Sequence, residues 1–234
     1  MFLLAICTSI FYAFVTYAMY IALEPFVRRR WPQAIISWSS VLTGHIQDPV
    51  VGRDVLFGIA LAVGWRAMER VGDFLAGNSA PGLDSTATLQ GIRSTFSVVA
   101  ILVPGSIRAM LVFFFVLFLL RIVLRNEWAA VVAFALIFAA RHYLGYTQYV
   151  LLNTVEAFII YASAAIAVVR LGLLVLVVAL FLADLLPHIP HAAPSAWYFG
   201  DGVVLAAIPI AMALWACYTS MKGHQLWKTD LLES

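Results

Sequence analysis

The stretches FFFVLFLL at residues 113–120 and LGLLVLVVALFL at residues 171–182 decide the fold class of this chain. Over the whole 234 residues, 64% of the side chains are hydrophobic and only 11% are charged, whereas soluble domains carry about 25% charged residues. A soluble domain would need polar surface between such apolar blocks, and the chain has little. The sequence therefore predicts an integral membrane protein with an all-α fold.

The number and length of the apolar blocks predict a polytopic transmembrane helical bundle. A spanning helix needs roughly 20 mostly apolar residues, so the chain has room for about seven spans joined by short loops. No linker divides the chain, and residues 1–234 are expected to form a single integral membrane domain. The predicted spans are residues 2–23, 55–75, 106–124, 128–144, 151–169, 171–186 and 203–219.

The sequence also predicts where three segments outside these spans lie relative to the membrane. Residues 31–54 alternate apolar and polar side chains at near-helical spacing, which indicates an interfacial segment with a short helix on the cytoplasmic side. Residues 76–105 predict an external loop with a re-entrant helix, because the apolar stretch 89–103 is too short to span and Pro104 follows it. Residues 220–234 predict a cytoplasmic tail.

Basic residues predict the orientation. Arg28, Arg29 and Arg30 follow the first span directly, and a run of arginine beside a membrane end is typical of the cytoplasmic side. Seven spans then leave the N-terminus outside and the C-terminus in the cytoplasm. Nine basic residues fall on the cytoplasmic side in this arrangement and five on the outer side, which supports it.

The sequence lacks the patterns of common enzyme sites. It has no Gly-x-Ser-x-Gly, no His-Glu-x-x-His, no phosphate-binding loop and no Rossmann glycine pattern. His188 and His191 are three residues apart, but no neighbouring Cys, Asp or Glu completes a set of four metal ligands. A net charge of +2 is too small to indicate nucleic-acid binding. We therefore expect neither catalysis, nor a metal site, nor a nucleic-acid partner.

Four polar residues in or beside predicted spans are candidates for function: Arg141, Asn153, Glu156 and Asp184. Charged groups inside a membrane are costly and are usually placed for a reason. One interpretation is a proton or ion path; the other is that Arg141 pairs with Glu156 or Asp184 and locks the bundle. His142 is either an axial ligand for a pigment or haem, or a hydrogen-bonding side chain at the interface.

A charged helical face is predicted in the second half of span 55–75. Arg66 and Glu69 are three residues apart, and Glu69 and Asp73 are four apart, so these side chains lie on one face of the helix. Such a face is expected to point at protein, water or headgroups rather than at lipid chains.

Six further motifs are distinctive: YIALEPFVRRRWP (20–32), ISWS (36–39), DPVVGRD (48–54), LLRIVLR (119–125), SAWY (195–198) and YTSMKG (218–223). Together they resemble the C-terminal membrane region of bacterial serine/threonine protein kinases, found notably in acidobacteria. The chain carries no glycine-rich loop, His-Arg-Asp or Asp-Phe-Gly of a kinase domain. The resemblance thus implies a membrane module without its catalytic partner, placed in a bacterial inner membrane.

These observations favour a non-catalytic membrane protein that anchors, senses or scaffolds for a partner or membrane complex. Its expected docking surface is basic and cytoplasmic: Arg28, Arg29, Arg30, Trp31 and Arg53. The first alternative is an accessory subunit of a photosynthetic or respiratory complex, in contact with pigments or quinones. The second is a small-solute or ion transporter with a cavity lined by Arg141, Asn153 and Glu156. The bilayer and partner proteins are the expected contacts, and lipids are the expected bound molecules.

Overall fold

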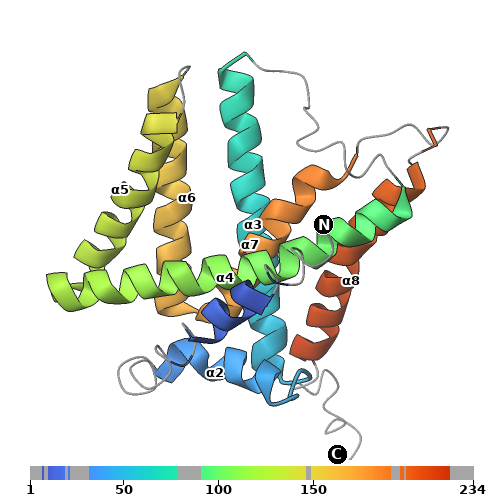
Figure 1. Ribbon diagram of the computed structural model, residues 1–234, viewed down its shortest axis with the longest axis horizontal. Helices are drawn as coiled ribbons and strands as arrows, with labels where there is room; N and C mark the ends of the chain where they lie inside the picture. The colour runs from blue at the N-terminus through green and yellow to red at the C-terminus, as the bar shows by residue number, and fades with distance from the viewer. Residues whose placement is uncertain are drawn as a thin grey trace, which may run out of the picture.

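The structure, a computed structural model, describes residues 7, 10–18, 21, 32–77, 91–145, 149–190, 196–197 and 199–221, and within these ranges it contains helices but no strand. After a helical segment at residues 10–18, the helices are α2 (Pro32–Leu42), α3 (Pro49–Leu75), α4 (Ile92–Leu124), α5 (Glu127–Gly145), α6 (Val150–Arg170), α7 (Leu173–Leu185), the 3-10 turn η2 (Leu186–His188) and α8 (Phe199–Met221) (Figure 1). The predicted all-α fold is confirmed.

By length and composition, three of the described helices could cross a membrane: α4, α6 and α8. Only 22–28% of the residues in their most apolar segments are buried inside the protein, so most of these side chains lie on its outer surface. An apolar exterior fits lipid as the solvent. The helix α7 is also apolar but shorter. Of the seven expected spans, the described structure therefore supports three as candidate membrane helices.

The helix α3 packs against both α7 and α8, and in Figure 1 it runs through the middle of the bundle. It begins where the side chain of Asp48 accepts a hydrogen bond of 2.9 Å from the amide of Val50, with Pro49 at the first helical position. Glycine permits close helix approach on two sides. A Cβ at Gly58 would lie 2.7 Å from Cβ of Val178 in α7, and one at Gly52 would lie 2.8 Å from the carbonyl oxygen of Ala216 in α8.

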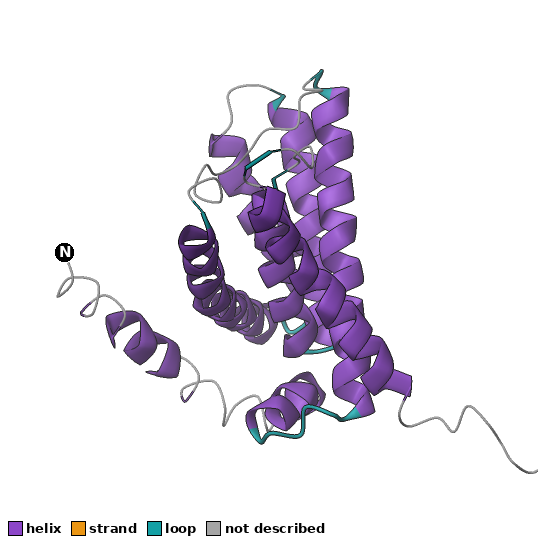
Figure 2. Ribbon diagram, turned by 90° about the vertical axis from the view of Figure 1, so that its right-hand side faces the viewer, coloured by secondary structure: helices purple, strands orange, loops and turns teal. Residues whose placement is uncertain are grey.

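The helix α4 does not run alongside the other long helices. In Figure 1 it crosses in front of α3 and α7, and after the quarter turn of Figure 2 it is seen close to end-on. Its 33 residues make it about 50 Å long, well beyond the roughly 30 Å of a bilayer core. Met110, Phe114 and Leu117 form its buried side in the core of the bundle.

The predicted helix end at Pro104 is wrong. Helix α4 continues through Pro104, so residues 92–103 and the predicted span 106–124 belong to one helix rather than to a re-entrant helix and a span. Proline removes only one backbone donor, and neighbouring helices and local adjustment compensate for it in apolar surroundings. The space around the next residue, Gly105, is open.

The helices α5 and α6 form an antiparallel hairpin with extensive mutual contact. Four aromatic rings join this hairpin to α4: Phe113, Phe134, Phe138 and Tyr161. Neighbouring ring centroids in the cluster are as close as 4.7 Å, with tilted and edge-to-face geometries that aromatic pairs prefer. This packing attaches the hairpin to α4 at one end and leaves its contact with α3 comparatively sparse.

Other sequence predictions fall partly outside the described residues. Half of the predicted first span, at residues 2–23, lies there, as does most of the predicted tail at residues 220–234. The segment predicted to be interfacial contains a helix, α2, and a turn leads from it to α3; its place relative to a membrane stays a prediction. A break between helices is also present where the fifth predicted span meets the sixth, at Leu171 and Gly172, and the glycine has a φ of 111°.

Candidate functional site

The charged face of α3 is internally paired. Arg66 forms an ion pair with Glu69, and Arg70 Nη1 lies 3.3 Å from Asp73 Oδ2. Both pairs join residues three positions apart on the helix, which places all four side chains on one side of its C-terminal half. The Arg66 side chain is the less exposed of the two arginines, at 24% against 47% for Arg70.

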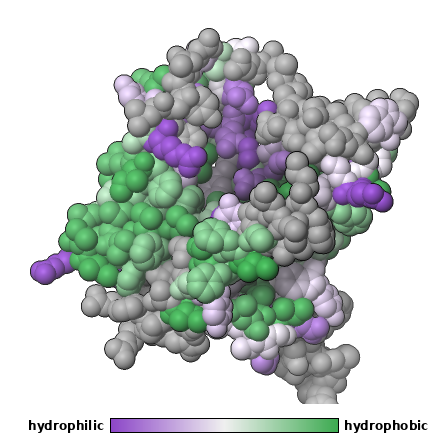
Figure 3. Space-filling model, viewed as in Figure 1, coloured by the Kyte–Doolittle hydropathy of each residue, from purple (hydrophilic) through white to green (hydrophobic). Residues whose placement is uncertain are grey.

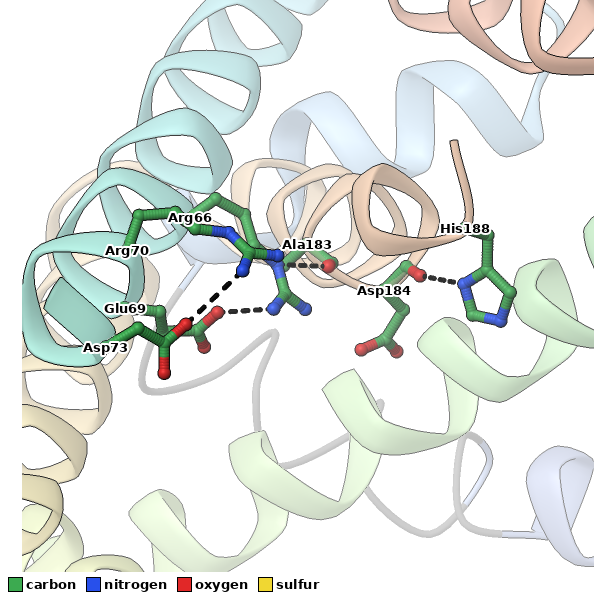
Figure 4. Close-up of polar contacts among 7 residues, drawn as sticks. All are labelled: Arg66, Glu69, Arg70, Asp73, Ala183, Asp184 and His188. Carbon is green, nitrogen blue, oxygen red and sulfur yellow. Dashed lines mark hydrogen bonds and ion pairs between the residues drawn. The ribbon is translucent and has the colours of Figure 1, made fainter. Parts of the chain in front are cut away.

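Arg66 also connects α3 to α7. Its Nε donates a hydrogen bond of 2.6 Å to the carbonyl oxygen of Ala183, as Figure 4 shows. The next residue, Asp184, faces the same space, and its own carbonyl oxygen accepts a hydrogen bond of 2.8 Å from Nδ1 of His188 in η2. The guanidinium therefore bridges a carboxylate of its own helix and the backbone of a neighbouring helix, whereas Arg70 and Asp73 on the same face are about half exposed.

Glu156 approaches the same region from α6. Its carboxylate lies against the backbone of α3 at Gly72, where an added Cβ would be 2.6 Å from Oε2. Its other oxygen, Oε1, is buried and has no hydrogen-bond partner in the part of the chain that the structure describes. An unpartnered buried polar atom costs free energy comparable to a lost hydrogen bond. Glu156 is thus the least satisfied member of this group.

We call these side chains the charged cluster: Arg66, Glu69, Arg70 and Asp73 of α3, Glu156 of α6 and Asp184 of α7. Four carboxylates and two guanidiniums give it a formal charge of −2. Figure 3 shows hydrophilic surface gathered in a depression over the upper part of α3, beside the apolar surface of the α4 and α5 side of the protein. The excess of negative charge suits a proton or a cation.

A second polar link lies deeper between the same helices. Nε1 of Trp65 in α3 donates a hydrogen bond of 2.8 Å to Oγ of Ser163 in α6, and that hydroxyl donates in turn to the carbonyl oxygen of Ile160. Trp65 is buried, so this bond satisfies a donor that could not otherwise reach water. Arg66, the first residue of the charged cluster, directly follows Trp65, so the cluster lies next to this contact between α3 and α6.

The sequence-predicted site residues are only partly brought together. Glu156 and Asp184 belong to the charged cluster, and Asn153 lies one turn before Glu156 on α6. Arg141 is exposed near the C-terminal end of α5, and within the described ranges no ion pair joins it to Glu156 or Asp184. The arginine that reaches α7 is Arg66 instead.

The remaining candidates are placed less fully. The side chain of His142 and residues Arg28 to Trp31 lie outside the described part of the protein. Arg53 is half-exposed at the start of α3 and pairs at 2.9 Å with the buried carboxylate of Asp54. No group of three His, Cys, Asp or Glu side chains with metal-binding geometry occurs among the described residues.

The link between Arg66 and α7 is the feature that sequence reasoning missed. The helical spacing of Arg66, Glu69 and Asp73 shows the charged face but not its neighbour, because the facing helix is more than 100 positions away in the chain. A small residue earlier on α3, Gly58, is a usable signal for a close neighbour, since small residues mark close helix approach in membranes and Gly58 meets Val178 of α7. No family model matches this chain, and no characterised protein or solved structure is detectably similar to it.

Proposed function

We propose that this protein is a non-catalytic polytopic membrane protein that serves as an anchor and sensor for a partner, with the charged cluster as its responsive element. The observation that carries the proposal is the contact of the Glu156 carboxylate with Gly72 across α3 and α6, with one carboxylate oxygen buried and unpartnered. Charged groups in apolar surroundings are costly and mark functional positions by default.

The cluster is arranged to convert a local change of charge into a change of helix contact. The two arginines of the charged cluster are engaged by Glu69, Asp73 and the carbonyl oxygen of Ala183, and neither forms an ion pair with Glu156 in the described structure. Neutralising Glu156, by a proton or a bound cation, removes repulsion between α6 and the carboxylates of α3. The α5–α6 hairpin would then close more tightly on α3.

The membrane setting and orientation of this module are part of the proposal. The basic residues 28–30 and Arg53 would lie on the cytoplasmic side of a bacterial inner membrane and form the docking surface, and the charged cluster would lie toward the outer side. The resemblance of its motifs to the membrane region of bacterial kinases is itself part of the proposal, and with it the protein would attach a cytoplasmic partner to the membrane or pass a signal to it. The remaining apolar segments would complete about seven spans.

A hydrogen-exchange comparison tests the responsive element. The full chain, in lipid nanodiscs, is compared with the variant Glu156→Gln, which keeps the side-chain volume and removes the charge. Backbone amides in the C-terminal half of α3 and the N-terminal half of α6 should exchange more slowly in the variant. The matched control is Glu127→Gln at the opposite end of the same hairpin, which should leave these amides unchanged. Unchanged or faster exchange in Glu156→Gln would contradict the proposal.

Transport of protons or small cations is a second candidate function. It is favoured by the hydrophilic depression of Figure 3 together with the unpartnered oxygen of Glu156. Vesicles containing the protein should then pass protons or monovalent cations faster than empty vesicles, and Glu156→Gln should abolish the difference. Equal flux with and without protein would eliminate this candidate.

A further inference from the structure

A second charged feature lies at the junction of α4, α5 and α6, far along the hairpin from the charged cluster. Helix α4 ends at Leu124, the next residue Arg125 has a left-handed backbone with φ of 53°, and Asn126 follows. The side chain of Asn126 accepts hydrogen bonds from the amides of Trp128 and Ala129, which starts α5 at once. This tight junction turns the chain back within two residues.

The hairpin geometry adds a third arginine to this junction. Helix α6 ends at Arg170, whose guanidinium carbon lies 5.8 Å from the ring centre of Trp128 at the start of α5. Arg121, one turn before the end of α4, pairs at 3.4 Å with Glu127. We call this group the arginine corner: Arg121, Arg125, Arg170, Glu127 and Trp128. Three guanidiniums and one carboxylate give it a formal charge of +2.

The two arginines not engaged by Glu127 are available at the surface. Arg125 and Arg170 are both exposed, and Trp128 is 57% exposed. A guanidinium presents a planar fork of donors that matches the oxygens of a phosphate group. A tryptophan with one apolar side and one N–H donor is typical of the boundary between lipid chains and headgroups.

The surroundings of the corner are apolar rather than polar. Ile122, Val123 and Leu124 on α4 are exposed, and Val132 on α5 is exposed one turn beyond Trp128. A soluble anion would gain nothing from this apolar surface, whereas the acyl chains of a lipid would cover it. The arginines therefore suit the phosphate group of a phospholipid, and the adjoining apolar surface suits its acyl chains.

We infer that the arginine corner binds the headgroup of an anionic phospholipid. The net positive charge selects an anionic headgroup over a zwitterionic one, since the latter brings a cation into the same site. Arg125 and Arg170 contact the phosphate, Trp128 lies at the depth of the glycerol, and the acyl chains lie along Ile122, Val123 and Val132. This inference rests on the membrane setting proposed above, but not on the role of the charged cluster.

The test measures lipid affinity of the detergent-solubilised full chain by native mass spectrometry. Short-chain phosphatidylglycerol should bind more tightly than short-chain phosphatidylcholine, and glycerol phosphate should not bind detectably. In Arg125→Gln/Arg170→Gln, affinity for phosphatidylglycerol should fall about 30-fold, because each basic side chain near an anionic lipid contributes about fivefold. Arg141→Gln, at the other end of the hairpin, is the matched control and should bind like wild type.

The Arg125→Lys/Arg170→Lys variant separates loss of charge from loss of fold. It should retain most of the selectivity for phosphatidylglycerol over phosphatidylcholine, with reduced affinity because ammonium groups lack the planar fork. Wild-type affinity in the double glutamine variant would overturn the inference, as would an equal loss in Arg141→Gln. Binding of glycerol phosphate as tight as that of the lipid would identify a free-anion site instead. Failure of the protein to incorporate into nanodiscs would contradict the proposed membrane setting, and with it the lipid site that rests on that setting.

Discussion

The carboxylate of Glu156 occupies the space that a side chain at Gly72 would need. A Cβ at position 72 would be 2.6 Å from Oε2 of Glu156, closer than real Cβ contacts. These two residues bring α6 and α3 together 84 positions apart in the chain (156 − 72). The absence of a side chain at Gly72 therefore determines where the carboxylate of Glu156 can lie.

Gly72→Ala should displace the Glu156 carboxylate and weaken the contact between α3 and α6. The displaced group is the end of a flexible side chain, so we expect a loss of only about 1 kcal/mol in the free energy of unfolding, measured in mixed detergent micelles. The double variant Gly72→Ala/Glu156→Ala should lose less than the sum of the single variants, because the added methyl no longer meets a carboxylate. Strict additivity would show that the two residues do not contact each other.

Gly58→Ala should be more damaging than Gly72→Ala. Its new Cβ would lie 2.7 Å from Cβ of Val178 and 2.9 Å from the carbonyl oxygen of Val175, and neither atom can move without shifting α7. We expect a loss of about 2–3 kcal/mol in the same unfolding measurement. Gly64→Ala is the matched control, since nothing lies within 4 Å of its Cβ and alanine favours the helix. Similar losses at both positions would contradict the packing of α3 against α7.

The hydrogen bond from Trp65 to Ser163 should couple α3 to α6. Trp65→Phe and Ser163→Ala each remove one partner, and a double-mutant cycle isolates their interaction. We expect a coupling free energy of about 0.5–1 kcal/mol, as found for hydrogen bonds between membrane helices. A coupling near zero would mean that the two side chains do not interact in lipid.

Arg66→Gln should destabilise the protein, whereas Arg70→Gln should have little effect. Removing Arg66 leaves the carboxylate of Glu69 and the carbonyl oxygen of Ala183 without their shared donor, and we expect a loss of about 2 kcal/mol. The pair of Arg70 and Asp73 is half-exposed on both sides, so its loss should cost less than about 0.5 kcal/mol. The unfolding free energies of the two variants are measured side by side. Equal losses would contradict the prediction that Arg66 connects two helices whereas Arg70 makes only a surface ion pair.

Local sequence patterns predicted several features of the structure well. The apolar blocks indicated helices, and the spacing of Arg66, Glu69 and Asp73 indicated a shared face, because both depend only on residues within a few turns. The predicted helix end at Pro104 failed for the same reason: a proline is a local signal, and its effect was overridden by the packing of α4 against other helices.

The charged residues of the candidate site could be found in the sequence, but their partners could not. Arg141 and Glu156 lie near adjacent ends of α5 and α6, which made them plausible partners. In the structure Arg141 is exposed, and Glu156 instead faces α3. The rotation of each helix about its axis decides which face meets which neighbour, and that rotation results from packing along the whole length of the helix.

By itself, the sequence determined the all-helical class and the apolar exterior, because composition and local periodicity decide whether a segment is stable as a helix in apolar surroundings. Only the tertiary structure decided that α4 crosses the bundle although α6 and α8, which are also apolar and long enough to span a membrane, do not. It also decided that α3 meets α6 at Gly72 and α7 at Ala183. Those outcomes depend on how side chains from distant parts of the chain fill a common space, and no short stretch of sequence contains that information.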